Sequence, residues 1–212
     1  MPKRVYLIRH GETEGTAEGR LMGVTDQPLS ARGADQVRRL AELLPGGLVA
    51  PGAATWCVAS PLRRAQQTAQ GVAGRAGLAV NTDADLREMH FGVWEGLTST
   101  EIETQFPQEQ AQWASPTDDT AFPDGESLGE FRDRVARAHE RIIGRPEDAV
   151  MVFTHGGVVR ELACRFLGLG HESYWLFDVQ PASVLRIDLY GDAAKGGAVL
   201  SGLWSVADWE VE

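Results

Sequence analysis

The sequence predicts an α/β fold, a three-layer α/β/α domain with a mainly parallel sheet. Short apolar runs typical of buried strands alternate with longer segments whose apolar residues recur at helical spacing. Strands that alternate with helices usually form a parallel sheet that is covered on both faces. Two of the apolar runs end next to a histidine, His10 and His155. Ligands of such sheets bind beyond the carboxyl ends of the strands, so the same pattern predicts where a site lies.

The first half of the chain contains three expected strands and two expected helices. Ser30 is a favourable cap for a helix with an apolar stripe over 34–44, which Pro45 and the glycines after it would end. Ser60 and Pro61 predict the start of the second helix, because Ser is favoured at the cap and Pro at the first helical position. The strands are expected at residues 5–8, 55–59 and 78–80.

The second half repeats the alternation after an irregular segment. Residues 86–126 are rich in Trp, Phe, Pro and acidic groups, and we interpret them as a lobe inserted into a single domain covering 1–212, with one short helix near 98–106. Ser127 and Glu130 form a capping box that predicts another helix. A last helix should follow Gly156 and Gly157. The remaining strands are expected at residues 149–154, 183–189 and 198–206, with a glycine-rich turn at 191–197.

Composition limits the classes of partner. The 212 residues are 43% hydrophobic and 24% charged, which is typical of a soluble globular domain. The net charge of −10 disfavours nucleic acid and anionic membrane surfaces as partners. Cys57 and Cys164 lie far apart in apolar stretches, which favours a reducing cytoplasm over a disulfide framework. We expect neither a signal peptide nor a membrane span, and the sequence leaves open whether the chain forms a homo-oligomer.

The residues at the two strand ends suit phosphoryl transfer. This reaction needs positive charge around the phosphate oxygens, an in-line nucleophile and a proton for the leaving oxygen. A neutral imidazole such as that of His10 is an available nucleophile near pH 7, and the Arg9 guanidinium beside it matches phosphate geometry. Gly11 lets the backbone approach an anion closely. His155 precedes a helix start, whose free N–H groups and dipole attract anions.

Six blocks of sequence resemble, in order, the motifs of the histidine phosphatase superfamily, which includes phosphoglycerate mutases, bisphosphatases and α-ribazole phosphatases. Each block is weak alone, but their order makes coincidence a poor explanation. The resemblance covers nearly the whole chain and implies a phosphoric monoester hydrolase without metal or organic cofactor. The blocks are Leu7–Thr13, Gly19–Gly23 with Asp26–Ser30, Ser60–Ala69, Leu86–Gly96, Phe122–Ser127 and Thr154–Arg160.

The resemblance also implies a role for individual residues. His10 corresponds to the nucleophile that becomes phosphorylated, and Arg9, Arg64 and His155 correspond to the groups that hold the phosphate. Glu88 corresponds to the general acid that protonates the departing alcohol. It would then act as the base for the water that hydrolyses the phosphohistidine. The substrate is expected to be a small phosphorylated metabolite.

Two of the implied substrate contacts are less direct. Gly156 would contribute a backbone N–H at the helix start. Thr16 stands where the family commonly carries Asn, so we expect its contact with the phosphate to be weaker. Helical spacing does not distinguish Arg63 from Arg64, and only the register against the family favours Arg64.

Three alternatives to a phosphatase stay open at this point. A phosphoglycerate mutase-type enzyme would use the same phosphohistidine, although mutases of this family generally have longer chains. A metal hydrolase would take ligands from His10, Glu12, His90 and His155, but their spacing matches no common zinc pattern. A catalytically inactive binding module is disfavoured by the intact motif residues. The identity of the ester is open among α-ribazole phosphate, sugar phosphates, phosphoserine and phosphoglycerates, with a slight leaning toward α-ribazole and broad-specificity phosphatases by resemblance.

Overall fold

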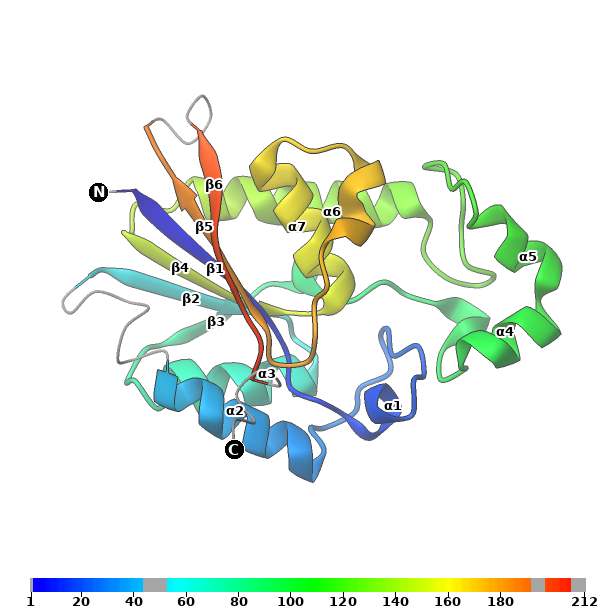
Figure 1. Cartoon of the computed structure of the whole chain (residues 1–212), viewed down its shortest axis with the longest axis horizontal. Helices are drawn as coiled ribbons and strands as arrows, with labels where there is room; N and C mark the ends of the chain where they lie inside the picture. Colours follow the sequence, from blue (N-terminus) through cyan, green and yellow to red (C-terminus); the bar gives the residue numbers. More distant parts are fainter. Residues whose placement is uncertain (1, 44–52, 192–196, 207–212) are drawn as a thin grey trace.

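Within residues 2–43, 53–191 and 197–206, which the computed structural model describes, six strands form one mixed sheet in the spatial order β3-β2-β4-β1-β5-β6 (Figure 1). The first four strands in chain order run parallel, β5 runs antiparallel to β1, and β6 runs antiparallel to β5. The predicted α/β class with a mainly parallel sheet is therefore confirmed. The strands are β1 (Lys3–Arg9), β2 (Thr55–Ala59), β3 (Val80–Thr82), β4 (Ala149–Thr154), β5 (Val184–Leu189) and β6 (Ala198–Trp204).

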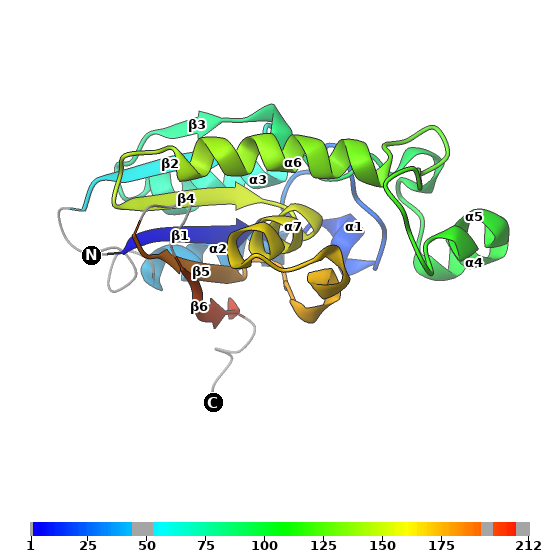
Figure 2. The ribbon, with the colours of Figure 1, turned by 90° about the horizontal axis from the view of Figure 1, so that it is seen from above.

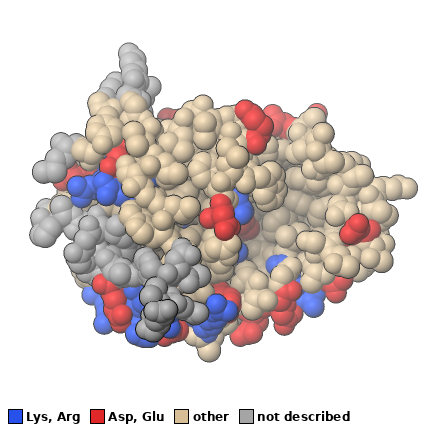
Figure 3. Space-filling model, in the orientation of Figure 1, with Lys and Arg blue, Asp and Glu red and all other residues tan. Residues whose placement is uncertain are grey.

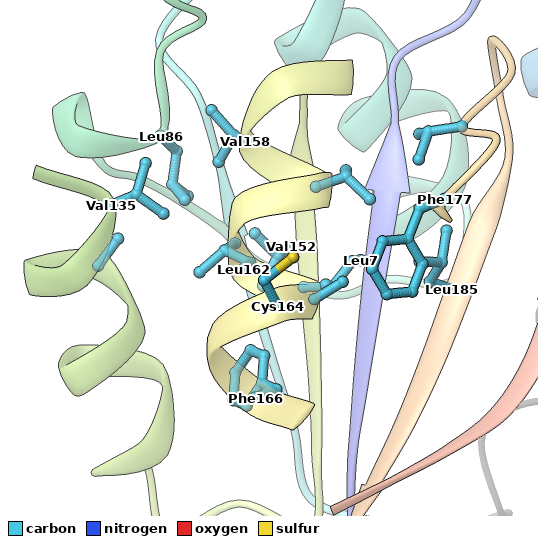
Figure 4. Close-up of a cluster of buried hydrophobic side chains, with 14 of the residues drawn as sticks. Leu7, Leu86, Val135, Val152, Val158, Leu162, Cys164, Phe166, Phe177 and Leu185 are labelled. Carbon is cyan, nitrogen blue, oxygen red and sulfur yellow. The ribbon is translucent and has the colours of Figure 1, made fainter. Parts of the chain in front are cut away.

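Helices cover both faces of the sheet, because successive strand residues point to opposite faces. Val5 and Leu7 of β1 face the core under α6 (Leu128–Ile143) and α7 (Gly156–Leu167). Tyr6 and Ile8 face the second core under α2 (Ala31–Leu43) and α3 (Arg63–Ala69). Figure 2 shows the layers from above, and Figure 4 shows strand side chains of the first core against those of α7.

The register brings the strand ends to one edge. Arg9 at the end of β1 pairs with Thr154 at the end of β4, and Ala59 of β2 pairs with Phe153. The backbone N–H of His10 donates to the Thr154 carbonyl at 2.9 Å. The residues that follow these three strands therefore meet at the same edge, as the sequence pattern predicts.

The start of α3 differs from the prediction. Ser60 does not cap this helix, which begins at Arg63. The Asp26 side chain accepts the Arg63 N–H at 2.6 Å and so provides the cap from a distant loop. The hydroxyl of Ser60 lies instead 2.8 Å from Nε2 of His155. By contrast, the capping box of Ser127 is present at the start of α6 and is confirmed.

The segment predicted as a lobe contains more helix than expected. It holds α4 (Ser99–Gln105), which was predicted, and also α5 (Pro107–Gln112), which was not. Pro107 is the first residue of α5, where its missing N–H costs no helical hydrogen bond. Figures 1 and 2 show both helices lying beyond the carboxyl ends of the strands.

Smaller differences from the predicted elements have local causes. β3 begins at Val80 rather than 78, because the Leu78 N–H still donates to the Ala73 carbonyl at the end of the preceding helical turns. A four-residue helix, α1 (Glu14–Ala17), was not predicted. The expected helix stop at 45–47 and most of the glycine-rich turn at 191–197 lie outside the described residues. No helix in the described ranges combines the length and the hydropathy that crossing a bilayer requires.

Candidate active site

A cavity of about 400 Å³ opens beyond the strand ends, between the sheet and the 86–126 lobe. The molecular face in Figure 3 is hollowed at this place, with Lys or Arg side chains beside the hollow. Arg9, His10 and Glu88 line the cavity directly, together with Thr16 and Gly156. Five of the seven predicted site residues thus share one cavity, and the other two, Arg64 and His155, lie behind His10.

The protonation of His10 is set by its two ring contacts. Nδ1 lies 2.7 Å from the Gly11 carbonyl, which can only accept, so Nδ1 carries the proton. Nε2 is therefore the free lone pair of a neutral ring, and it accepts from Nε of Arg64 at 3.1 Å. Burial lowers the pKa of His10 well below its ordinary value, and the charges of Arg64 and Arg9 lower it further. Such an imidazole is unprotonated and nucleophilic at neutral pH.

The structure distinguishes the two adjacent arginines of α3. Arg64 is fully buried, whereas Arg63 is exposed and is not among the residues that line the cavity. The two terminal nitrogens of Arg64 donate to carbonyls of the loop that precedes Asp26. These bonds hold the guanidinium in one place while its Nε faces His10. The acceptors are the carbonyls of Thr25 at 2.9 Å, Met22 at 2.9 Å and Gly23 at 2.6 Å.

His155 and Arg9 complete the positive side of the site. The rings of His155 and His10 meet edge to face, with centroids 5.1 Å apart. Nδ1 of His155 and Nε of Arg9 are buried and have no partner among the described residues. Arg9 is anchored by a bond from a terminal nitrogen to the Val179 carbonyl at 2.6 Å. Burial lowers the pKa of Arg9 to about 10, so its guanidinium is still charged at neutral pH.

Glu88 lines the same cavity as His10 and is 8% exposed. One of its oxygens accepts the Gly157 N–H at 3.0 Å, and the other accepts the N–H of Met89 at 3.0 Å. A β-carbon at position 157 would lie 2.5 Å from the carboxylate, so only glycine fits there without a shift. The start of α7 thus positions the carboxyl that sequence resemblance implies as the acid.

A buried arginine on α6 holds the backbone of the Glu88 segment. Arg134 is 5% exposed, and it donates to the carbonyl of Glu88 at 3.0 Å and to that of Arg87 at 2.6 Å. Its guanidinium also makes a two-pronged ion pair with Glu126, at 2.6 and 2.8 Å. On the other side, the Thr154 hydroxyl donates to the Leu86 carbonyl at 2.7 Å, which ties the segment to the end of β4.

The two remaining predicted contacts have different surroundings. Gly156 is the first residue of α7, and a β-carbon there would meet its neighbours at ordinary contact distance. Thr16 lines the cavity, but its hydroxyl donates to the Thr13 carbonyl at 3.0 Å and accepts the Thr13 N–H at 2.8 Å. With its proton used in this capping box, the Thr16 hydroxyl has no hydrogen left to donate to a phosphate.

The ligand set of the metal-hydrolase alternative does not converge. Glu12 accepts from the Ser30 hydroxyl at 2.9 Å and lies 3.8 Å from Arg32, away from the two catalytic-type imidazoles. His90 lines a different pocket, beside Arg134. Within the described ranges, no group of three or more His, Cys, Asp or Glu side chains has the arrangement of a metal site.

Sequence reasoning missed several residues that position the site. Ser60 was assigned to a helix cap but contacts His155, and Asp26 was not assigned a role but caps α3. Arg160 lines the cavity one turn after Gly156 on α7, and this helical spacing is the signal that would have found it. Tyr174 also lines the cavity. No helical spacing points to it, because it lies in a separate turn at His171–Leu176.

Comparison with known proteins gives a consistent result. Residues 5–197 match the sequence model of the histidine phosphatase superfamily (branch 1). The chain is 34% identical over 186 residues to a probable phosphoglycerate mutase GpmB of Serratia proteamaculans, covering 87% of this chain and 84% of that protein.

Solved structures share the fold over nearly their whole length. One is a crystal structure of a putative α-ribazole-5′-P phosphatase from Escherichia coli, with a TM-score of 0.85, 30% identity and 97% of each chain covered. A mycobacterial glucosyl-3-phosphoglycerate phosphatase matches with a TM-score of 0.79 and 28% identity, covering 97% of this chain and 99% of that one. Phosphatase names thus occur among the structural matches, and the mutase name comes from a sequence match.

Proposed function

The chain belongs to the histidine phosphatase superfamily, and from this premise we propose that it hydrolyses a small-molecule phosphate monoester through a phosphohistidine on His10. One observation carries the proposal. The neutral Nε2 of His10 lies beside the Arg64 guanidinium, and His10 lines the same cavity as Arg9 and Glu88. A nucleophile, a positive charge and a proton carrier are the groups that phosphoryl transfer requires, and the proposal assigns these roles to His10, Arg64 and Glu88.

In the first step Nε2 of His10 attacks phosphorus and the bond from phosphorus to the alcohol oxygen breaks. Before substrate enters, the Nε–H of Arg64 donates to the lone pair on Nε2 of His10. The incoming phosphate accepts this N–H instead, which frees the lone pair to attack. The bonds of Arg64 to loop carbonyls keep the guanidinium charge in place meanwhile. Glu88, in its acid form, gives its proton to the departing alkoxide. Arg9 and the N–H groups at the start of α7 stabilise the transferred group.

In the second step water attacks the phosphorus of phospho-His10 and the phosphorus–nitrogen bond breaks. Glu88, now a carboxylate, accepts the proton of that water. Inorganic phosphate leaves, and His10 and Glu88 return to their starting protonation. His155, buried against His10, disperses the charge of the intermediate through its ring N–H.

The proposal includes a reaction without metal and a location in the cytoplasm. Support for the first is that the guanidinium groups of Arg9 and Arg64 supply the positive charge for which other phosphoryl-transfer enzymes use metal ions. Support for the second is that Cys57 and Cys164 are both free and buried.

The test is a turnover screen over a panel of phosphate esters, with and without EDTA, on wild type and His10→Ala. We expect phosphate release that is insensitive to EDTA and lowered at least about 1,000-fold in the variant. Rapid quenching after a ³²P-labelled ester should trap label that is stable to base and labile to acid on wild type alone. Full activity of His10→Ala would end the proposal.

Phosphoglycerate mutase-type transfer is the second candidate, and the mutase names of the relatives favour it. It uses the same phosphohistidine and differs only in the acceptor. Mixing the labelled phosphoenzyme with 2- or 3-phosphoglycerate separates the two. Hydrolysis predicts that the label appears as inorganic phosphate at an unchanged rate. A mutase instead transfers the label to the added phosphoglycerate, which becomes 2,3-bisphosphoglycerate.

A further inference from the structure

The cavity has two chemically different ends. At one end lie the groups that the proposed reaction uses, among them Arg9, His10 and Glu88. The other end is formed by the lobe and is lined by an aromatic wall, which we define as Phe91, Trp94, Trp113 and Phe122. At about 400 Å³ the cavity lies in the range of sites that enclose a complete small molecule and is larger than a phosphate group needs.

The aromatic wall is held in shape by contacts among its own rings. Phe122 is the centre of these contacts. Trp113 stacks on it with ring centroids 4.2 Å apart, and Trp94 meets it edge to face at 5.2 Å. Phe91 approaches the same ring at 5.0 Å from another side. A surface that is already packed in this way loses little side-chain entropy when a flat apolar group binds to it.

Two basic side chains near this wall already have acidic partners. Arg20 donates to Glu18 at 2.7 Å and to Glu101 at 3.1 Å, so two carboxylates neutralise its guanidinium. Nδ1 of His171 faces Glu161 at 3.4 Å. A second anionic group on the substrate, such as the carboxylate of a phosphoglycerate, would have to break an ion pair to reach Arg20, while the guanidinium of Arg160 lies against the Tyr174 and Trp175 rings and donates to the Phe177 carbonyl. The lining therefore favours a neutral group.

A further aromatic ring stands at the rim of the cavity. Trp175 lines it and yet is 78% exposed, and its ring lies 5.3 Å from the Arg160 guanidinium. Arg160 is fixed by a 3.0 Å bond to the Phe177 carbonyl. Leu176, adjacent to Trp175, is 75% exposed, so the two residues together leave apolar surface open to solvent beside the cavity. The Trp175 ring is placed to cover a group that rests on the aromatic wall.

We propose that the ester hydrolysed at this site has a neutral, flat and mainly apolar alcohol, which binds against the aromatic wall and under Trp175. Trp113 and Trp175 are then specificity-determining residues. The inference rests on the proposed phosphatase function and deepens it, because it assigns the substrate class rather than the reaction.

The test compares two esters whose leaving groups have the same chemistry. Ethyl phosphate and 2-(1-naphthyl)ethyl phosphate both release a primary alcohol and differ only in the aromatic ring. We expect kcat/KM of wild type to be about 10- to 100-fold higher for the naphthyl ester, which is the range for burying one aromatic group. Trp113→Ala should lower this ratio about tenfold and Trp175→Ala about threefold.

Trp56→Ala is the matched control, because Trp56 lies in β2 against Arg145, away from the cavity lining. It should leave the ratio unchanged. The ratio is internal to each protein, so partial unfolding of a variant lowers both rates and does not imitate the expected result. A wild-type ratio near one, or a high ratio that survives in both cavity variants, would overturn the inference while leaving the phosphatase intact. Turnover of neither ester would remove the phosphatase proposal itself, and this inference with it.

Discussion

At the scale of single residues, burial decides the chemical state of the site. His10 and His155 are both almost completely buried, and burial lowers the pKa of each well below the ordinary value of histidine. The neighbouring guanidinium of Arg64 lowers both further. The fold thus keeps two neutral imidazoles beside fixed positive charge, which favours an attacking lone pair over a second cation.

This burial predicts how stability depends on pH. The unfolded chain protonates these histidines below about pH 6.5, whereas the folded protein holds them neutral. The unfolded state then binds more protons, so the free energy of unfolding falls as the pH drops below about 6.5, by up to about 1.4 kcal/mol per pH unit for each histidine. Urea unfolding of wild type and His10→Asn between pH 5 and 7.5 checks this. The variant should show a shallower slope, and parallel curves would contradict the assignment.

Two adjacent glycines predict a sharp difference between neighbouring variants. Gly157→Ala places a methyl group 2.5 Å from the Glu88 carboxylate, whereas the same change at Gly156 meets its nearest atoms at 3.5 Å. We expect Gly157→Ala to lower kcat about 100-fold through displacement of the acid, with KM within a few-fold of wild type. Gly156→Ala is the control, because Gly156 lies in the same first turn of α7, and we expect its kcat to be near normal. Equal kcat values for the two variants would show that Glu88 does not act from this place.

At the scale of elements, α6 acts on the site from a distance through its buried arginine. Arg134 pairs with Glu126 and donates to three backbone carbonyls, and Arg134→Met removes all of these bonds. We expect this change to lower the free energy of unfolding by about 3–5 kcal/mol. Arg137 lies one turn along α6 and pairs with Asp85 while 59% exposed. Arg137→Met should therefore cost less than about 1 kcal/mol. Urea denaturation measures both, and similar losses would contradict the different roles.

The start of α3 shows how a loop and a helix share one task. Asp26 accepts the first N–H of the helix, and the carbonyls just before it accept from Arg64 on the same helix. The loop therefore fixes the position of α3 and the orientation of its arginine together. Arg63, the preceding residue, contributes the backbone N–H that Asp26 accepts, while its side chain is exposed.

At the scale of the whole molecule, net charge and local charge have opposite signs. The chain carries −10, while the guanidinium of Arg9 lines the cavity beside His10 and that of Arg64 contacts the His10 ring. We expect heparin or duplex DNA, at 150 mM salt, to leave KM for a small ester within twofold of its normal value. An extended polyanion must approach the acidic surface, whereas a small ester meets only the cavity. Competitive inhibition at micromolar polyanion would show that the acidic surface does not exclude such partners.

Much of the fold follows from local sequence. The strands β2 and β4 have the predicted bounds. Apolar runs this short favour a strand in the middle of a sheet over any other buried element. The capping box of Ser127 is satisfied within four residues, so tertiary context cannot easily change it. The start of α3 was predicted wrongly because its cap comes from Asp26, which is 37 residues away.

The sequence by itself determined the nature of the site, since histidines and arginines at the ends of parallel strands must meet at one edge of the sheet. Tertiary structure alone decided which guanidinium of the Arg63–Arg64 pair contacts His10. It also decided that the Thr16 hydroxyl donates to the Thr13 carbonyl, and that aromatic rings of the lobe line the same cavity as His10. The physical reason is that these outcomes depend on contacts between residues far apart in the chain, whose partners no local pattern specifies.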